Sequence, residues 1–192
     1  MPIKNNWTDP IVRIKWMPTR YTFEITPLRE YLIRIIRQKG GKWIDPFVGR
    51  SPIKHLCYKT NDLATEANGH VIEADYHLDA LKFFKLFENA SLEGVILDPP
   101  YSPRQVKECY ESVGKKVLQT DTQSTFWSAL RDETARVLKP GGTAITFGYN
   151  TTGIGSTRGF DIRKIIMIAH SGQHNDTLVT ISKKTRKQLT EF

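Results

Sequence analysis

The sequence predicts one α/β domain whose core is a mostly parallel, seven-stranded β-sheet with helices on both faces. Apolar segments of strand length alternate with segments in which apolar residues recur every three or four positions, which is typical of βαβ units. Two strand-like segments near the end of the chain flank a polar turn and add a terminal antiparallel hairpin. The length of 192 residues fits a single domain, and no repeat or linker divides it.

The first predicted helix has the most complete set of local signals. Thr26 can cap it and Pro27 takes the first helical position, while Gly40 and Gly41 end it. Further helices are predicted after Asp79, which can cap the next one, and over residues 102–113 and 124–138. The apolar face of the first helix consists of Leu28, Tyr31, Leu32, Ile35 and Ile36.

Seven segments have the length and composition of strands. Pro140-Gly141-Gly142 is expected to end the helix before the strand at 143–147. Residues 1–21 are basic and interrupted by prolines, so we expect a basic N-terminal arm or an edge segment, followed by one folded domain over residues 22–192. The tail from Lys183 is basic and is expected to be solvated. The predicted strands are 42–45, 55–60, 71–75, 94–97, 143–147, 162–169 and 177–182.

The composition favours some classes of function and argues against others, as the charge and the cysteine and histidine content show. Lys and Arg total 28 against 20 Asp and Glu, a net charge of +8 that favours a polyanionic partner such as nucleic acid. Two cysteines are too few for a disulfide scaffold, and the five histidines match no zinc motif, so no metal site is expected. The chain has no signal-peptide core and no run of 18 apolar residues, so no membrane association and a cytoplasmic location are expected.

Four acidic residues fall at or just after predicted strand ends: Asp45, Asp62, Asp79 and Asp98. In an open α/β sheet, ligands bind at the carboxyl ends of the strands. Acids on that rim suit a ligand that presents a cation, hydroxyl groups and an amino group. The alternative is helix capping and turn formation, which by itself would explain Asp79.

The run Asp98-Pro99-Pro100-Tyr101 has a chemical interpretation of its own. A nucleobase amine is a poor nucleophile because its lone pair is conjugated into the ring. A carboxylate can accept one of its N–H bonds and the carbonyl of the following residue the other, while the aromatic ring stacks on the base. Two prolines stiffen the backbone and aim that carbonyl. The alternative is a rigid turn that simply ends a strand.

This run resembles the catalytic loop of amino-group methyltransferases that use S-adenosylmethionine, specifically the DNA adenine-N6 branch. Residues 45–51, Asp-Pro-Phe-Val-Gly-Arg-Ser, are similar to the cofactor loop of that family, with Ser51 in place of its second glycine. Residues 23–28, Phe-Glu-Ile-Thr-Pro-Leu, resemble the segment that helps hold the methionine end of the cofactor. By the same resemblance, Asp62 stands where the family binds the ribose, and Asp79-Ala80 where it contacts the adenine.

The resemblance extends over nearly the whole chain and is strongest to small standalone DNA methylases common on phages and mobile elements. It implies a Rossmann-like class I methyltransferase fold, with residues 22–192 as the catalytic domain, and methyl transfer from S-adenosylmethionine to N6 of a flipped adenine in DNA. The implied catalytic residues are Asp98, Pro99, Pro100 and Tyr101. The implied cofactor-binding residues are Thr26, Pro27, Asp45, Pro46, Phe47, Gly49, Asp62, Asp79 and Ala80.

The resemblance also bears on partners. Double-stranded DNA is the principal expected substrate and single-stranded DNA the alternative, in the cytoplasm of a prokaryotic or phage-infected cell. Nothing is left over for a separate target-recognition domain. Recognition must therefore come from loops, with residues 102–124 the first candidate, from the N-terminal arm, or from a second subunit in a homodimer. An RNA adenine-N6 or guanine-N2 methyltransferase, or a catalytically inactive nucleic-acid-binding module, remains the alternative.

Overall fold

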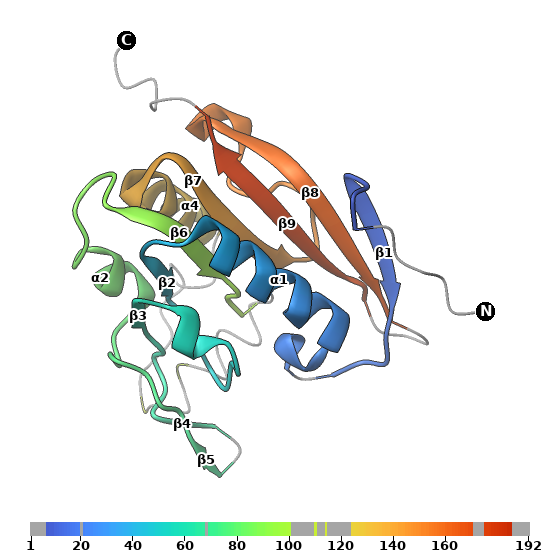
Figure 1. Ribbon diagram of the computed structural model, residues 1–192. Helices are drawn as coiled ribbons and strands as arrows, with labels where there is room; N and C mark the ends of the chain where they lie inside the picture. Colours follow the sequence, from blue (N-terminus) through green and yellow to red (C-terminus); the bar gives the residue numbers. More distant parts are fainter. Residues whose placement is uncertain are drawn as a thin grey trace.

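A computed structural model of the chain shows a seven-stranded sheet with helices on both faces (Figure 1). It describes residues 7–19, 21–67, 69–100, 110, 114, 124–170 and 175–185. The strand order is β1-β8-β9-β7-β6-β2-β3, and β9 runs antiparallel to both of its neighbours, whereas the other neighbouring pairs are parallel. The predicted fold class, including the antiparallel hairpin of β8 and β9, is confirmed.

The elements have the following bounds. In spatial order, the sheet contains β1 (Ile11–Lys15), β8 (Phe160–Ala169), β9 (Thr177–Lys184), β7 (Leu138–Gly148), β6 (Leu92–Leu97), β2 (Trp43–Asp45) and β3 (Lys59–Thr60). A separate two-stranded hairpin pairs β4 (Glu66–Ala67) with β5 (His70–Val71). The helices are α1 (Thr26–Lys39), α2 (Ala80–Phe84) and α4 (Ser124–Val137), with short 3₁₀ turns η1 (Thr22–Glu24), η2 (Lys54–Leu56) and η4 (Ser156–Arg158).

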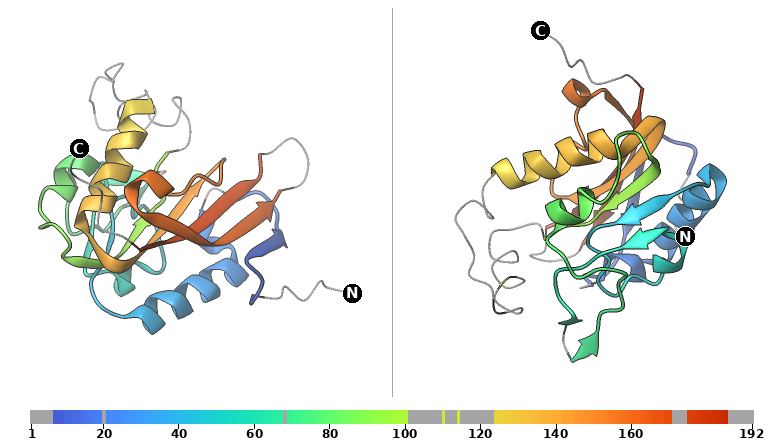
Figure 2. Two further views of the ribbon diagram at one scale, coloured as in Figure 1. Left: turned by 90° about the horizontal axis from the view of Figure 1, so that it is seen from above. Right: turned by 90° about the vertical axis from the view of Figure 1, so that its left-hand side faces the viewer.

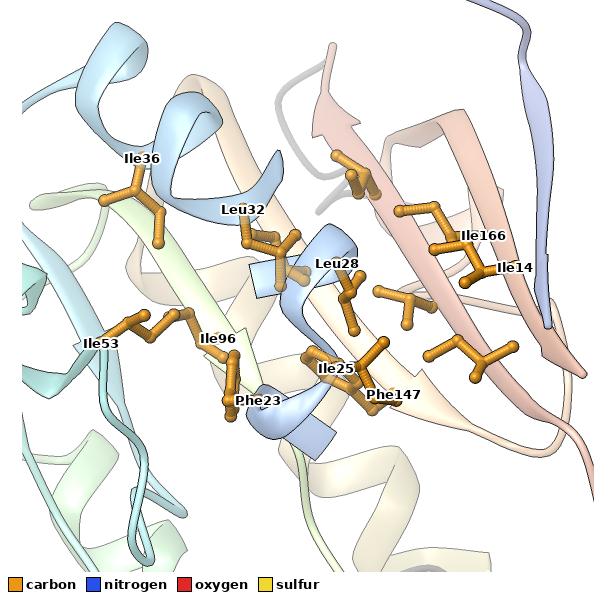
Figure 3. Close-up of a cluster of buried hydrophobic side chains, with 14 of the residues drawn as sticks. Ile14, Phe23, Ile25, Leu28, Leu32, Ile36, Ile53, Ile96, Phe147 and Ile166 are labelled. Atoms are coloured by element: carbon orange, nitrogen blue, oxygen red, sulfur yellow. The ribbon is translucent and has the colours of Figure 1, made fainter. Parts of the chain in front are cut away.

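The central strands of the sheet are buried on both faces, whereas alternate residues of the edge strand β1 are exposed. Helix α1 covers one face with Leu28, Leu32 and Ile36, while α2 and α4 cover the other (Figure 2). Successive residues of β6 point to opposite sides, so Ile96 packs with α1 and Leu97 with the α2 and α4 side. Figure 3 shows the α1 side of this core, where the apolar face predicted from the helical spacing meets the sheet. Each fully buried Leu or Ile contributes roughly 1.5–3 kcal/mol of transfer free energy.

The start of α1 corrects one local expectation. Thr26 does not cap the helix, because it is the first helical residue and Ile25 takes the cap position without a side-chain bond. Pro27 lies in the first turn as expected. Gly40 closes the helix with φ of 63°, a left-handed conformation that glycine adopts without steric cost.

The seventh strand comes from the N-terminal segment, for which an arm and an edge segment were the two expectations. The predicted strand at 71–75 is wrong, since His70–Val71 folds back on β4. The chain then returns to β3 through side-chain bonds of Asp75 to Thr60 and an isolated parallel bridge between Asn61 and Tyr76. Instead, β1 from the N-terminal segment forms the opposite edge, paired with β8. The buried Lys164 side chain fastens this edge by donating to the carbonyls of Trp7 and Asp9.

The predicted strand at 55–60 is shorter than expected. The turn η2 occupies its first part, with Leu56 N–H bonded to Ile53 O and Cys57 N–H to Lys54 O. Only Lys59–Thr60 pairs with β2. These local turn bonds satisfy backbone groups that a longer strand would have offered to the sheet.

Two further expectations change near the end of α4. Strand β7 begins at Leu138, before the Pro140-Gly141-Gly142 run, which lies within it. Lys184 belongs to β9 and is buried, so it is not part of a solvated tail. Its Nζ donates to the carbonyl of Ala135 (2.6 Å) in the last turn of α4 and to that of Leu138 (2.8 Å), the first residue of β7. Helix-terminal carbonyls lack partners within the helix, and a cation there also favours the helix dipole.

In the part of the chain that the structure describes, no helix is long and apolar enough to cross a membrane.

Gly94 provides a test of the packing between β6 and β2. A Cβ built at Gly94 would lie 2.1 Å from Trp43 Cδ2, so we expect Gly94→Ala to displace the indole and destabilise the fold by about 1–3 kcal/mol. Gly148→Ala is the matched control, since nothing lies within 4 Å of its Cβ position and we expect a change within about 0.5 kcal/mol. Urea unfolding of both variants checks this, and equal stabilities would contradict it.

Candidate functional site

Three of the four predicted acids meet at one edge of the sheet. The parallel strands β3, β2 and β6 are neighbours, and their carboxyl ends are followed or occupied by Asp62, Asp45 and Asp98 respectively. The carboxylates are close enough for Asp98 and Asp62 to raise the pKa of Asp45, although burial raises it more. Three of the acids predicted at strand ends therefore do lie together at the carboxyl edge of the sheet.

Asp45 is the most constrained of these acids. It is fully buried, and its Oδ1 accepts a hydrogen bond from the Phe47 N–H at 3.0 Å. Its Oδ2 is buried without a hydrogen-bond partner in the structure as described. Burial raises the pKa of this carboxyl well above its usual range, against the opposing effect of the Phe47 N–H. A buried, unsatisfied carboxylate oxygen is costly, so it is a candidate to receive a donor from a ligand.

Asp62 holds the loop that follows β2. Its Oδ2 accepts from the Gly49 N–H and its Oδ1 from the Ala64 N–H, each at 2.9 Å. Burial raises the pKa of Asp62, and the two N–H bonds partly offset that effect. Gly49 has a φ of 47°, which a residue with a side chain adopts only with strain. The loop therefore depends on both the glycine and the acid.

Asn61 completes this framework, and the sequence reasoning missed its role. Its buried side-chain amide donates to Pro46 O (3.1 Å) and Leu78 O (3.0 Å), and its Oδ1 accepts from Leu78 N–H (2.9 Å). It thus ties the loop after β2 to the segment that leads into α2. In the sequence, Asn61-Asp62 indicated only a strand end, because the partners of the amide are backbone groups of distant residues.

Asp79 caps helix α2, as the helix-capping alternative predicted, and it also contacts Tyr110. Its Oδ1 caps α2 by accepting from Leu81 N–H (3.0 Å) and Lys82 N–H (3.4 Å). Its Oδ2 accepts from the Tyr110 hydroxyl at 2.9 Å, a residue that the sequence did not single out. Ala80 is buried in the core on the α2 side.

A cavity of about 400 Å³ opens beside the Asp45–Ser51 loop. We call it the loop cavity. It brings together η1, the loop and Asp98, and its walls include Phe23, Glu24, Phe47, Gly49 and Asp98. Ser51, which replaces the expected glycine, is buried there, and its Oγ accepts from Ile53 N–H at 3.4 Å. The loop therefore accommodates a serine.

Thr26 and Pro27 lie elsewhere. They line a different cavity, of about 450 Å³, together with Trp7, Trp16 and Tyr31. In the structure these two predicted cofactor residues therefore do not share the loop cavity with Phe47 and Gly49.

A third cavity, of about 250 Å³, lies between α4 and the carboxyl ends of β6 and β7. We call it the α4 cavity. Pro99 forms part of its wall, with Trp127, Arg131, Tyr149 and Asn150. Asp98 lines the loop cavity and the adjacent Pro99 lines the α4 cavity, so the end of β6 separates the two. Pro100 is half-buried.

Several predictions fall outside the described residues. Tyr101 is among them, as is the segment 102–124 proposed for DNA contact apart from Tyr110, Gly114 and the helix start at Ser124. Within the described ranges, no group of three or more His, Cys, Asp or Glu side chains could hold a metal ion.

Comparison with known proteins identifies the fold of the chain, but it does not assign the chain to a sequence family. No protein-family model matches the chain, and no curated protein matches it in sequence. Among solved structures, 116 chains match its fold. TrmN from Thermus thermophilus superposes with a TM-score of 0.52 at 16% identity over 82% of this chain, which spans only 48% of the TrmN chain.

Two other matches have the same score. The 1,6-didemethyltoxoflavin-N1-methyltransferase of Burkholderia thailandensis is 10% identical over 81% of this chain and 76% of its own. An S-adenosylmethionine-dependent methyltransferase of Archaeoglobus fulgidus is 14% identical, over 82% of this chain and 93% of its own; both have a TM-score of 0.52. At these identities the likeness establishes the fold, which is the Rossmann-like class I methyltransferase fold.

The buried Asp45 carboxyl predicts a distinctive pH dependence of stability. Its pKa is raised in the folded state, so its favourable contribution is complete below the unfolded pKa and is lost as the pH rises through the folded pKa. In that window, stability falls by up to about 1.4 kcal/mol per pH unit for one such group.

Asp45→Asn keeps an oxygen to accept from Phe47 N–H but removes the charge. We expect it to be more stable than the parent protein at pH 8 and equal to it, or less stable, at pH 3.5. Asp161→Asn, at an exposed position on β8, is the control and should shift stability little at either pH. Denaturant unfolding at both pH values measures the difference, and a less stable Asp45→Asn variant at pH 8 would refute it.

Proposed function

We propose that the chain is an S-adenosylmethionine-dependent methyltransferase that methylates the exocyclic N6 of adenine in DNA. The observation that carries this proposal is the position of Asp98-Pro99 between two cavities at the carboxyl edge of the sheet. One cavity can hold the methyl donor and the other the acceptor base. The class I methyltransferase fold supports the coarser part of the proposal.

Two acids beside the loop cavity fit the proposed cofactor, because Asp45 begins the loop that lines the cavity and Asp62 holds its Gly49. The unpartnered Oδ2 of Asp45 is a buried acceptor at a site where an ammonium group would be stabilised. Each carboxylate oxygen of Asp62 has a second lone pair, so Asp62 can hold the Gly49 loop and still accept from ribose hydroxyls. When bound, the cofactor supplies an electrophilic methyl group on a sulfonium.

On the acceptor side, Asp98 and the carbonyl of Pro99 accept the two N–H bonds of the target amine, and Tyr101 stacks on the base. Flipping a base out of a duplex costs a few kcal/mol. Stacking can return about 1–3 kcal/mol, and each hydrogen bond to a charged group about 1.5–3 kcal/mol. Transfer is direct and in line, and no enzyme residue becomes methylated.

The choice of DNA rests on the resemblance of Asp98–Tyr101 and its flanking residues to DNA adenine methylases, together with the net charge of +8. Duplex DNA is the proposed substrate, with recognition by loops, by the N-terminal segment or by a second copy of the chain. The proposed setting is the cytoplasm of a prokaryotic or phage-infected cell.

A labelled methyl-transfer assay on unmethylated duplex DNA, single-stranded DNA and RNA, with base analysis of the product, tests the proposal. N6-methyladenine in DNA is the expected product. Methylation of RNA alone, at adenine N6 or guanine N2, would replace the proposed substrate. Absence of transfer, together with no calorimetric binding of S-adenosylmethionine or S-adenosylhomocysteine, would leave a nucleic-acid-binding module without catalysis.

We expect Asp98→Ala to lower the turnover number by roughly 100-fold or more, as when one preorganised polar group is lost from an active site. Cofactor affinity should stay within several-fold, because the main partner of Asp98 is the target amine. Tyr101→Ala should lower activity more than Tyr101→Phe, since stacking needs the ring. Asp161→Ala is the control for loss of an exposed carboxylate. Steady-state kinetics and calorimetry measure both effects, and near-normal turnover of Asp98→Ala would contradict the assignment.

A further inference from the structure

Among the described residues that line the α4 cavity, Arg131 is the one with a charged side chain. It is half-buried on α4, and in the structure as described its guanidinium has neither a hydrogen bond nor an ion pair. An arginine that serves only the fold would be expected to use its donors. Arg131 therefore stands out from the other arginines of this region.

The neighbouring arginines show the contrast. Arg158 bonds to Asp132 Oδ1 at 2.6 Å and to Ser128 Oγ at 2.8 Å, which fastens η4 to α4. Arg136 bonds to Glu133 and to the carbonyls of Phe84 and Phe87. Asp132 is next to Arg131 in sequence, but its Oδ1 already pairs with Arg158. Among the described residues that line the cavity, Arg131 thus has no matching acid.

The local field also favours an anion. Burial and the nearby charge of Arg158 both lower the pKa of Arg131. Guanidinium stays protonated at any ordinary pH, so the protein carries the cost of this partly desolvated cation. An anion bound in the cavity would remove that cost. The planar fork of guanidinium suits the paired oxygens of a phosphate.

The rest of the cavity suits a flat ring next to that anion. Trp127, Tyr149 and Pro99 provide aromatic and rigid apolar surface, and Tyr149 is 46% exposed at the mouth. A volume of about 250 Å³ lies below the usual range for drug-sized ligands and fits a single ring system. Pro99 places this surface directly beside the proposed catalytic acid.

We propose that Arg131 binds the backbone phosphate of the nucleotide whose base enters the α4 cavity. The site takes a nucleoside phosphate within a nucleic-acid strand, and Arg131 is a substrate-positioning residue that sets the depth of the base relative to Asp98. This inference rests on the proposed function for the choice of DNA as the nucleic acid, but the phosphate contact can be tested without any methyl transfer.

The test compares Arg131→Gln with Arg37→Gln. Arg37 is an exposed residue of α1, on the opposite face of the sheet, so its substitution removes the same charge away from the cavity. A fluorescent adenine-containing DNA oligonucleotide is titrated in the presence of S-adenosylhomocysteine at several salt concentrations. We expect roughly 10- to 100-fold weaker binding for Arg131→Gln, the loss of one charge-assisted contact, and a salt slope shallower by about 0.9. Arg37→Gln should stay within about twofold.

Two further measurements separate positioning from structure. If Arg131 served to stabilise the fold, Arg131→Gln would lower the melting temperature. Removal of an unpartnered, half-buried cation should leave the melting temperature unchanged or raise it. Arg131→Lys keeps the charge without the fork and should recover part of the affinity. Unchanged oligonucleotide affinity and salt slope in Arg131→Gln would overturn the proposal. A lower melting temperature together with weaker S-adenosylhomocysteine binding would overturn it as well.

Competition identifies the source of the phosphate. Adenosine monophosphate should displace the oligonucleotide from the parent protein more effectively than inorganic phosphate, and this advantage should shrink in Arg131→Gln. Equal displacement by inorganic phosphate would indicate a simple anion site and overturn the nucleotide assignment. If Arg131-dependent binding persists but no nucleic acid is methylated, the proposed function fails while the phosphate site stands.

Discussion

The carboxyl edge of the sheet depends on a buried carboxylate that the protein does not fully satisfy. Asp45 ends β2 in complete burial, with one oxygen bound to Phe47 N–H and the other without a partner in the described structure. Removing such a group from water costs free energy that its single bond does not recover. The surrounding loops are held in place by other groups, Asp62 on Gly49 and Asn61 on Pro46. The unsatisfied oxygen of Asp45 is thus held in place by neighbours that have their own hydrogen bonds.

The order of strands explains how one edge can serve two ligands. Strand β6 lies between β2 and β7, so its end adjoins the Asp45 loop on one side and the end of β7 on the other. Just after the end of β6, Asp98 and Pro99 line different cavities although they are adjacent in sequence. A donor and an acceptor molecule could therefore approach the same short segment from opposite sides without competing for space.

The features that the sequence predicted are those set by neighbours along the chain. The apolar spacing of α1, the cap at Asp79 and the alternation of helices and strands all depend on residues a few positions apart. The strand-end acids were found in the same way, because a strand end is a local signal. For the N-terminal segment the sequence left an arm and an edge segment open. The choice depends on the pairing of Ile11–Lys15 with Ile165–Ala169, about 150 residues further on. In the sequence Lys184 looks like part of a polar tail, because its two carbonyl partners, Ala135 in α4 and Leu138 in β7, are distant along the chain.

Arg131 illustrates the same limit at the site itself. In the sequence it is one of many basic residues and lies on a helix whose apolar positions, such as Leu130, identify it as a core element. What distinguishes it lies in its surroundings: Asp132 pairs with Arg158, and the described residues that line the cavity beside Pro99 include no acid. A net charge of +8 predicts attraction to polyanions, but it does not predict where on the protein a phosphate would bind. An uncompensated guanidinium in a cavity wall is specific in a way that surface lysines are not, because its desolvation has already been incurred before the ligand arrives.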